Sequence, residues 1–219
     1  MSTWPLSFSN VMPTTALPKG WRWASLLEKD VAQLKSGHTP SRNEPSYWGG
    51  EVPWISLRDV KGLSSIYIND TADHPTPKGI ENSAARMLPE GTVVLSRTAS
   101  IGHCAIMGRE MATSQDFANW ICGPLLDPLF LLFVFRGSLP VLKRASDGAI
   151  HKTIYMPTIK RAKIIIPPLD KQRELVKRLS DAWATARAMQ EAASVAKAAV
   201  EALPGALLRA AFPTAEARS

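Results

Sequence analysis

The chain is poor in the residues that build metal sites and disulfide scaffolds. Its 219 residues include two cysteines, Cys104 and Cys122, and four histidines, with no CxxC pair and no zinc-type spacing. A disulfide framework and a structural zinc ion are therefore not expected. The sequence also has no nucleophile elbow, no phosphate-binding glycine loop, and no methyltransferase or nuclease motif. These absences argue against an enzyme.

Long apolar runs and a leader segment are also missing. The most apolar stretch, Leu125 to Phe135, is short and is interrupted by Asp127 and Pro128, so it does not predict a membrane span. The first residues lack the basic segment followed by an apolar one that a secretory signal requires. We therefore expect a cytoplasmic protein with no membrane partner.

Acidic residues are fewer than basic ones. The chain has 26 Lys and Arg against 19 Asp and Glu, which gives a formal net charge of +7 and a pI near 9.6. Such a surplus favours nucleic acid over an anionic membrane as the partner, although charge of this size also serves solubility alone. Hydrophobic residues make up 45% and charged residues 21%, which excludes disorder as the main state.

Proline and glycine divide the chain into two parts. Residues 1–168 contain 15 of the 17 prolines and all but one of the 13 glycines. Helical spacing of apolar residues occurs at 23–34 and at 128–137. Short apolar runs between turn residues predict strands at 52–56, 92–96, 102–107 and 163–166. We expect residues 1–168 to form one irregular, mixed α+β domain.

Residues 169–219 are predicted to form one long C-terminal α-helix. From Leu169 to Leu203 there is no glycine or proline, alanine is frequent, and Asp170 is a plausible cap. Pro204-Gly205 is expected to end the helix before a last apolar turn. Apolar positions alternate in steps of four and three, which predicts a coiled-coil seam and favours a partner helix over packing on its own domain. The seam residues are Leu175, Leu179, Ala182, Ala186, Met189, Ala193, Ala196, Val200 and Leu203.

Four segments of the first part place polar and basic residues on expected loops. The first, residues 34–42, is rich in turn formers and carries Ser41 and Arg42. A loop of this kind can bind phosphates and follow a groove. The second, residues 95–102, is a turn that carries Ser96, Arg97 and Thr98. Arginine on such a turn either contacts a guanine or a phosphate, or is simply solvated.

The third and fourth segments leave similar alternatives. In residues 112–117, Gln115 has the chemistry to bind an adenine edge, but Ser114 and Asp116 also have the chemistry of a simple turn cap. The fourth segment, residues 146–153 together with the preceding Lys143 and Arg144, begins the densest basic stretch of the chain, for which phosphate contact is the natural use. Its candidate residues are Lys143, Arg144, His151 and Lys152.

In this order, the segments resemble the specificity subunit of type I restriction-modification systems. The resemblance covers roughly residues 17–212, and the order and spacing of its motifs are more specific than any one of them. Its target-recognition domain is matched by Ser36–Arg42, Tyr47–Gly50, Pro53–Ser56 with Asp59, Ser96–Gly102 and Thr113–Asp116. Its helix is matched by Lys163–Leu169, Lys171–Glu174 and Leu203–Phe212.

The resemblance implies a non-catalytic subunit that recognises DNA for separate enzymes. The family's usual subunit has two recognition domains and two helices, whereas this sequence has one of each and no internal repeat. It is therefore expected to be a half-length subunit that forms a homodimer through its helix. Two identical readers would then recognise a bipartite inverted repeat in DNA.

The same resemblance implies the partners and the contacts. No cofactor is expected on this chain, because S-adenosylmethionine would be bound by a methyltransferase subunit, and ATP and Mg by a restriction subunit that joins as a further partner. Double-stranded DNA would be contacted at base edges or nearby sugar-phosphate by Arg42, Arg97, Gln115 and Lys152. Its backbone would be positioned by Ser41, Ser96, Thr98, Lys143, Arg144 and His151.

Two other interpretations remain open on the sequence alone. In the first, the chain is an interaction protein with a weak or degenerate reader, and its helix exchanges with half of a full-length specificity subunit. In the second, the chain is a stand-alone enzyme, which the missing catalytic motifs argue against.

Overall fold

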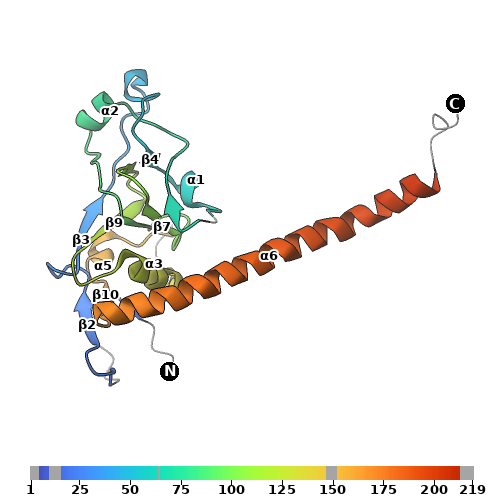
Figure 1. The fold of residues 1–219 in the computed structure, drawn as a ribbon. Helices are drawn as coiled ribbons and strands as arrows, with labels where there is room; N and C mark the ends of the chain where they lie inside the picture. The colour runs from blue at the N-terminus through green and yellow to red at the C-terminus, as the bar shows by residue number, and fades with distance from the viewer. Residues whose placement is uncertain (1–4, 10–15, 64, 147–151, 213–219) are drawn as a thin grey trace. The chain divides into compact units, whose positions relative to one another are not determined.

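The computed structural model describes residues 5–9, 16–63, 65–146 and 152–212, and Figure 1 shows its elements. The chain divides into two compact units, Met1–Val176 and Lys177–Ser219. The fold is a mixed α+β domain followed by a long C-terminal helix, which confirms the predicted fold class. The pairing of this helix into a coiled coil stays a prediction.

A five-stranded sheet lies at the centre of the first unit. Its strand order is β3-β9-β6-β7-β5, and all neighbours are antiparallel except β5 and β7. The predicted strands at 92–96 and 102–107 are confirmed as β6 and β7. The strands are β3 (Ala32–Ser36), β5 (Tyr67–Ile68), β6 (Val93–Ser96), β7 (Cys104–Met107) and β9 (Phe117–Cys122).

Two smaller sheets complete the strands of this unit. The strand predicted at 163–166 is confirmed as β10 (Lys163–Ile166), which lies between β1 (Leu6–Ser7) and β2 (Arg22–Ser25). The strand predicted at 52–56 is confirmed in shorter form as β4 (Trp54–Ile55), paired in parallel with β8 (Ala112–Thr113). The β4–β8 pair brings two of the predicted recognition segments together.

The core covers both faces of the central sheet. Strand β6 is buried at every position, with Val93 and Leu95 in one apolar cluster and Val94 in another. Successive side chains of a strand point to opposite faces, so each face of β6 has its own core. The predicted helix at 128–137 is confirmed as α3 (Pro128–Gly137), which contacts β6 and β7. Asp127 caps α3 by accepting hydrogen bonds from two of its first backbone N–H groups.

The helix predicted at 23–34 is wrong. This segment forms β2, a turn and β3, and each strand pairs with a part of the chain that is distant in sequence: Trp23 lies opposite Ile165, and Leu34 lies opposite Trp120. The turn is closed by Glu28, whose carboxylate accepts from the Ser25 N–H at 2.8 Å. The apolar spacing resembled a helix because two short strands and a tight turn also place apolar residues three and four positions apart.

The predicted helix end at Pro204-Gly205 is also wrong, because the long helix α6 runs from Leu169 to Ala211 with Pro204 inside it. Proline removes one backbone hydrogen bond from a helix, and the alanine and leucine residues on both sides strongly favour the helical state. The uninterrupted helix extends the predicted seam by a further step of four to Leu207 and a step of three to Ala210.

The first turns of α6 belong to the first unit. Gln172 is fully buried, and its side-chain amide donates to the carbonyl oxygens of Leu125 (2.8 Å) and Pro167 (2.9 Å). Its carbonyl oxygen accepts from the Asp127 N–H at 2.9 Å. One side chain thus joins the helix start to the segment before α3. Four short α-helices and a 3-10 helix complete the unit: α1 (Leu57–Val60), α2 (Pro77–Glu81), α4 (Leu139–Arg144), α5 (Met156–Ile159) and η1 (Pro45–Tyr47).

Candidate nucleic-acid interface

The second, third and fourth predicted segments meet through backbone hydrogen bonds. The turn after β6 pairs with the end of the fourth segment and the residue that follows it: Ala99 N donates to Lys152 O (2.9 Å), and Ile154 N donates to Arg97 O (2.8 Å). On its other side, Arg97 N donates to Asp116 O at 2.8 Å. These contacts join residues that are 19 to 57 positions apart in sequence, so the three segments form one continuous surface.

Asp116 holds this junction together with its side chain. One carboxylate oxygen accepts from the Thr98 hydroxyl at 2.5 Å, and the other accepts from the Ser114 hydroxyl at 2.9 Å. The turn cap considered from the sequence is thus present, and it also reaches the neighbouring turn. Asp116 was not among the predicted site residues, although its spacing from Ser114 was a usable signal.

Arg97 and Gln115 lie together at the surface of this junction. Arg97 Nη2 donates to the backbone oxygen of Gln115 at 2.7 Å, while its Nε is buried without a hydrogen-bond partner among the described residues. Gln115 is exposed, and its side-chain oxygen accepts from the Thr39 hydroxyl at 2.5 Å. The Thr39 contact was not predicted. The two side chains that best suit base recognition are thereby fixed side by side.

The first segment lies directly against the third. His38 N donates to Thr113 O at 2.9 Å, and Gly37 permits this approach. A Cβ atom at Gly37 would be 2.1 Å from Thr113 Oγ1 and 2.3 Å from Ser114 O, so a larger residue does not fit without a shift of backbone. All four predicted segments therefore belong to one surface.

The turn of the second segment is shaped from inside. Ser96 is buried, and its hydroxyl donates to Ser100 O and accepts from His103 N at 3.1 Å. Ala99 has a φ of 49°, a left-handed conformation that among the described non-glycine residues occurs only there. Such a conformation costs roughly 1–2 kcal/mol in a non-glycine residue, so the surrounding hydrogen bonds must hold it.

Arg42 lies within an aromatic cluster. Its guanidinium carbon is 3.6 Å from the ring centroid of Trp48 and 5.2 Å from that of Trp54, and its Nη2 pairs with Asp73 at 2.8 Å. The hydrogen bond from Arg42 holds the pKa of Asp73 below its usual value. Ser41 beside it is exposed, and its carbonyl oxygen accepts from Trp48 Nε1 at 3.0 Å. About half of the Arg42 side chain remains exposed.

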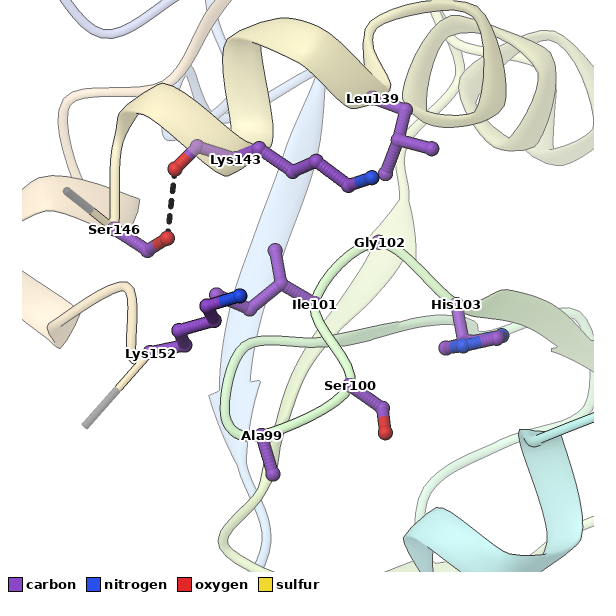
Figure 2. A pocket seen from close by; sticks show the side chains of 9 residues that line it. All are labelled: Ala99, Ser100, Ile101, Gly102, His103, Leu139, Lys143, Ser146 and Lys152. Atoms are coloured by element: carbon purple, nitrogen blue, oxygen red, sulfur yellow. Dashed lines mark hydrogen bonds between the residues drawn. The ribbon is translucent and has the colours of Figure 1, made fainter.

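The basic residues of the fourth segment lie beside the turn of the second. Lys143 and Arg144 are exposed at the end of α4, and Lys152 is exposed where the chain pairs with Ala99. Lys143 and Lys152 both line a cavity against the turn (Figure 2). The predicted contact His151 lies outside the described residues.

The described parts of the chain have neither a candidate metal cluster nor a candidate membrane-spanning helix. No group of three or more His, Cys, Asp or Glu residues there is arranged to hold a metal ion. Within the same residues, no helix is both long enough and apolar enough to cross a bilayer.

The fold and the surface define a basic recognition domain joined to a long helix. The profile of the family described as type I restriction modification DNA specificity domain matches residues 18–193. Since this match covers most of the chain, the protein belongs to the type I restriction-modification DNA specificity family. The predicted resemblance is confirmed, and with it the prediction of a specificity-subunit class rather than a class of enzymes.

Individual relatives agree with this assignment. The chain is 31% identical over 166 residues to the type I restriction enzyme MjaIX specificity subunit of Methanocaldococcus jannaschii, a match that covers 75% of this chain and 38% of that protein. The HsdS subunit from Thermoanaerobacter tengcongensis has a similar fold, with a TM-score of 0.60 and 21% identity over 82% of this chain and 41% of that chain. A chain from a structural study of complex assembly and conformational transition of the type I R-M system also has a similar fold, with a TM-score of 0.69 and 22% identity. This match covers 90% of this chain and 46% of that chain. The protein spans less than half the length of these relatives.

Proposed function

We propose that this protein is a DNA-recognition subunit of a type I restriction-modification complex. It binds double-stranded DNA through residues 1–168, and its helix region, residues 169–219, provides spacing, dimerisation and methyltransferase docking. It carries out no chemistry itself and binds no cofactor, because S-adenosylmethionine and ATP with Mg are used by the methyltransferase and restriction partners. The observation that carries the proposal is the meeting of all four polar segments on one surface of a domain of this family.

Base recognition is assigned to the Arg97–Gln115 pair. An arginine fork suits guanine, and a glutamine amide suits adenine, when their side chains are held at a fixed angle. Here the turn around Thr98 and Asp116 supplies that fixation. Arg42 is a further contact, since its exposed half is held on Trp48, although its pairing with Asp73 offsets part of its charge.

Contacts to the DNA backbone are assigned to the exposed polar residues around this pair. Phosphate contacts fix the position of a protein on DNA and make its affinity depend on salt. Lys143, Arg144 and Lys152 supply the charge, and Ser41 supplies an exposed hydroxyl. Thr98 is half-buried and contributes by holding the turn through its hydrogen bond to Asp116. Ser96 acts indirectly, by shaping the turn from inside the fold.

The recognition proposal is tested by selecting sites from random duplexes with the purified protein. Arg97→Ala is expected to weaken specific binding by about 1–3 kcal/mol and to relax preference at one position. Arg97→Lys, which keeps the charge but loses the planar fork, should lose the same preference with a smaller loss of affinity. Arg173→Ala, at an exposed arginine on α6, is the control. An unchanged preference in Arg97→Ala would remove this residue from the reader.

Pairing of α6 with the same helix of a second copy is the second part of the proposal. The helix has 43 residues, which corresponds to a rod of roughly 64 Å. Beyond Val176 its seam is solvent-exposed, with Met189 67% and Leu207 66% exposed. An apolar row of this length is stabilised by a partner helix, and a two-fold pair would present two readers to a bipartite inverted repeat.

The oligomeric proposal is tested by the mass of the protein in solution. Met189→Glu places a charge on the seam and should convert a dimer into a monomer. Ala188→Glu adds the same charge to the adjacent exposed position outside the seam and should leave the dimer intact. A Met189→Glu protein that remains dimeric would refute the seam.

A full-length specificity subunit is the alternative partner of the same seam. Exchange would appear as a heterodimer when the two proteins are mixed, at the expense of the homodimer. In that case the helix assignment stands. The DNA-binding surface of this protein would then recognise one half of the DNA site of the mixed complex or, if that surface has degenerated, no part of it. Site selection with the mixed complex separates these two outcomes.

A further inference from the structure

A cavity of about 510 Å³ lies between the turn of residues 99–103 and helix α4. Figure 2 shows the side chains of Lys143 and Lys152 extending toward the turn from two sides. His103, Ser100 and Ser146 also line it, and none of the nine lining residues is acidic. Two ammonium groups lining one cavity with no acidic residue beside them give it a positive charge that attracts an anion.

The size and the walls of the cavity suit an anion that is larger than phosphate and has an apolar part. A lone phosphate needs much less space, whereas pockets of about 300–1,000 Å³ are typical of small-molecule ligands, a class that includes a nucleotide. Leu139 and Ile101 give the cavity an apolar wall against which a sugar or a base can lie. The lysines would bind the phosphate of such a ligand as point charges.

The local backbone is built so that this cavity exists. Gly102 has a φ of 92°, a backbone conformation that favours glycine, and a Cβ atom there would be 2.4 Å from Leu139 Cδ1, so a larger residue would strain the turn and displace the Leu139 side chain. The left-handed Ala99 directs the chain back toward Lys152, to which it is hydrogen-bonded. The strained turn therefore places Lys152 across the cavity from Lys143.

We infer that this cavity is a binding site for a nucleoside phosphate, with the phosphate held between Lys143 and Lys152. The inference deepens the proposed function and rests on it where the nucleotide is part of the bound DNA strand. The same chemistry also fits a free nucleotide. The two sources are distinguished by measuring duplex DNA and AMP separately.

The test uses the full protein, with Lys143→Gln, Lys152→Gln and the double variant. If the nucleotide belongs to the DNA, each substitution lowers the slope of log affinity against log salt by about one, and the double variant by about two. If the ligand is a free nucleotide, AMP binds the wild-type protein in calorimetry and the double variant binds it at least tenfold more weakly. The double arginine variant should restore either property, because it keeps both charges. Lys197→Gln, at an exposed lysine of α6, is the charge-matched control.

The salt slope and the AMP affinity together decide whether the cavity binds a nucleotide. A change in either the salt slope or the AMP affinity, beyond that of Lys197→Gln, supports the site. If the wild-type protein binds DNA but the double variant has the salt slope and AMP affinity of the control, the site is overturned. The phosphate contacts assigned to Lys143 and Lys152 are overturned with it, while DNA recognition through the rest of the surface stands. Wild-type protein that binds no DNA overturns the proposed function, while the AMP measurement still decides the site.

Discussion

Replacing Gln172 is expected to destabilise the recognition unit more than its single position suggests. Gln172→Ala removes the partners of Pro167 O, which is buried, and of Leu125 O and Asp127 N, which are partly buried. A buried polar group without a partner costs about 1–3 kcal/mol, and a partly buried one about half of that. The free energy of unfolding should therefore fall by about 2–6 kcal/mol, a large part of the stability of a typical domain.

The assay is urea unfolding followed by tryptophan fluorescence at one protein concentration. Gln172→Glu tests the reasoning further, because it preserves the size and the acceptor but places a carboxylate oxygen against two carbonyl oxygens. Its loss of stability should be at least as large. Gln190→Ala, at an exposed glutamine of the same helix, should change stability by less than about 0.5 kcal/mol. If Gln172→Ala matched Gln190→Ala, the anchoring role of this side chain would be refuted.

Three further predictions concern the recognition unit. Burial raises the pKa of Cys104 to about 11 and that of Cys122 to about 12, so mass spectrometry should find neither alkylated by iodoacetamide at pH 8 until the protein is unfolded. The arginine partners of Asp73 lower its pKa, so its carboxylate stabilises the fold above the unfolded pKa of about 3.9 and loses this effect as the pH falls through the folded pKa. Thermal melts at decreasing pH should therefore show the stability difference between wild-type protein and Asp73→Asn becoming smaller. Gly37→Ala should lower the melting temperature, whereas Gly137→Ala, with open space around it, should not.

Local chemistry in the sequence was sufficient for several elements. The strands β6, β7 and β10 and the helix α3 are short apolar runs bounded by turn residues or by a good cap, and these signals act over a few residues. The polar segments and the basic surplus also indicated the type of partner, because charge and hydroxyl content do not depend on the fold. The motif order indicated the family.

Non-local pairing decided what the sequence alone misjudged. The segment 23–34 has a helix-like apolar spacing, but pairing with β10 and β9 stabilises it as strands. Pro204 favours a helix end locally, because proline inside a helix costs about 3 kcal/mol, but α6 continues through it to Ala211.

The recognition surface itself required the tertiary structure. The sequence determined that Ser41, Arg97, Gln115 and Lys152 lie on polar loops, but those loops are far apart along the chain. Only the packing of the strands determined that the four loops meet. Asp116 and Gln172 were overlooked as key residues for the same reason, since their importance comes from partners up to 47 residues away. Hydrogen bonds between distant segments leave no periodic signal in a single sequence, so only the folded chain reveals them.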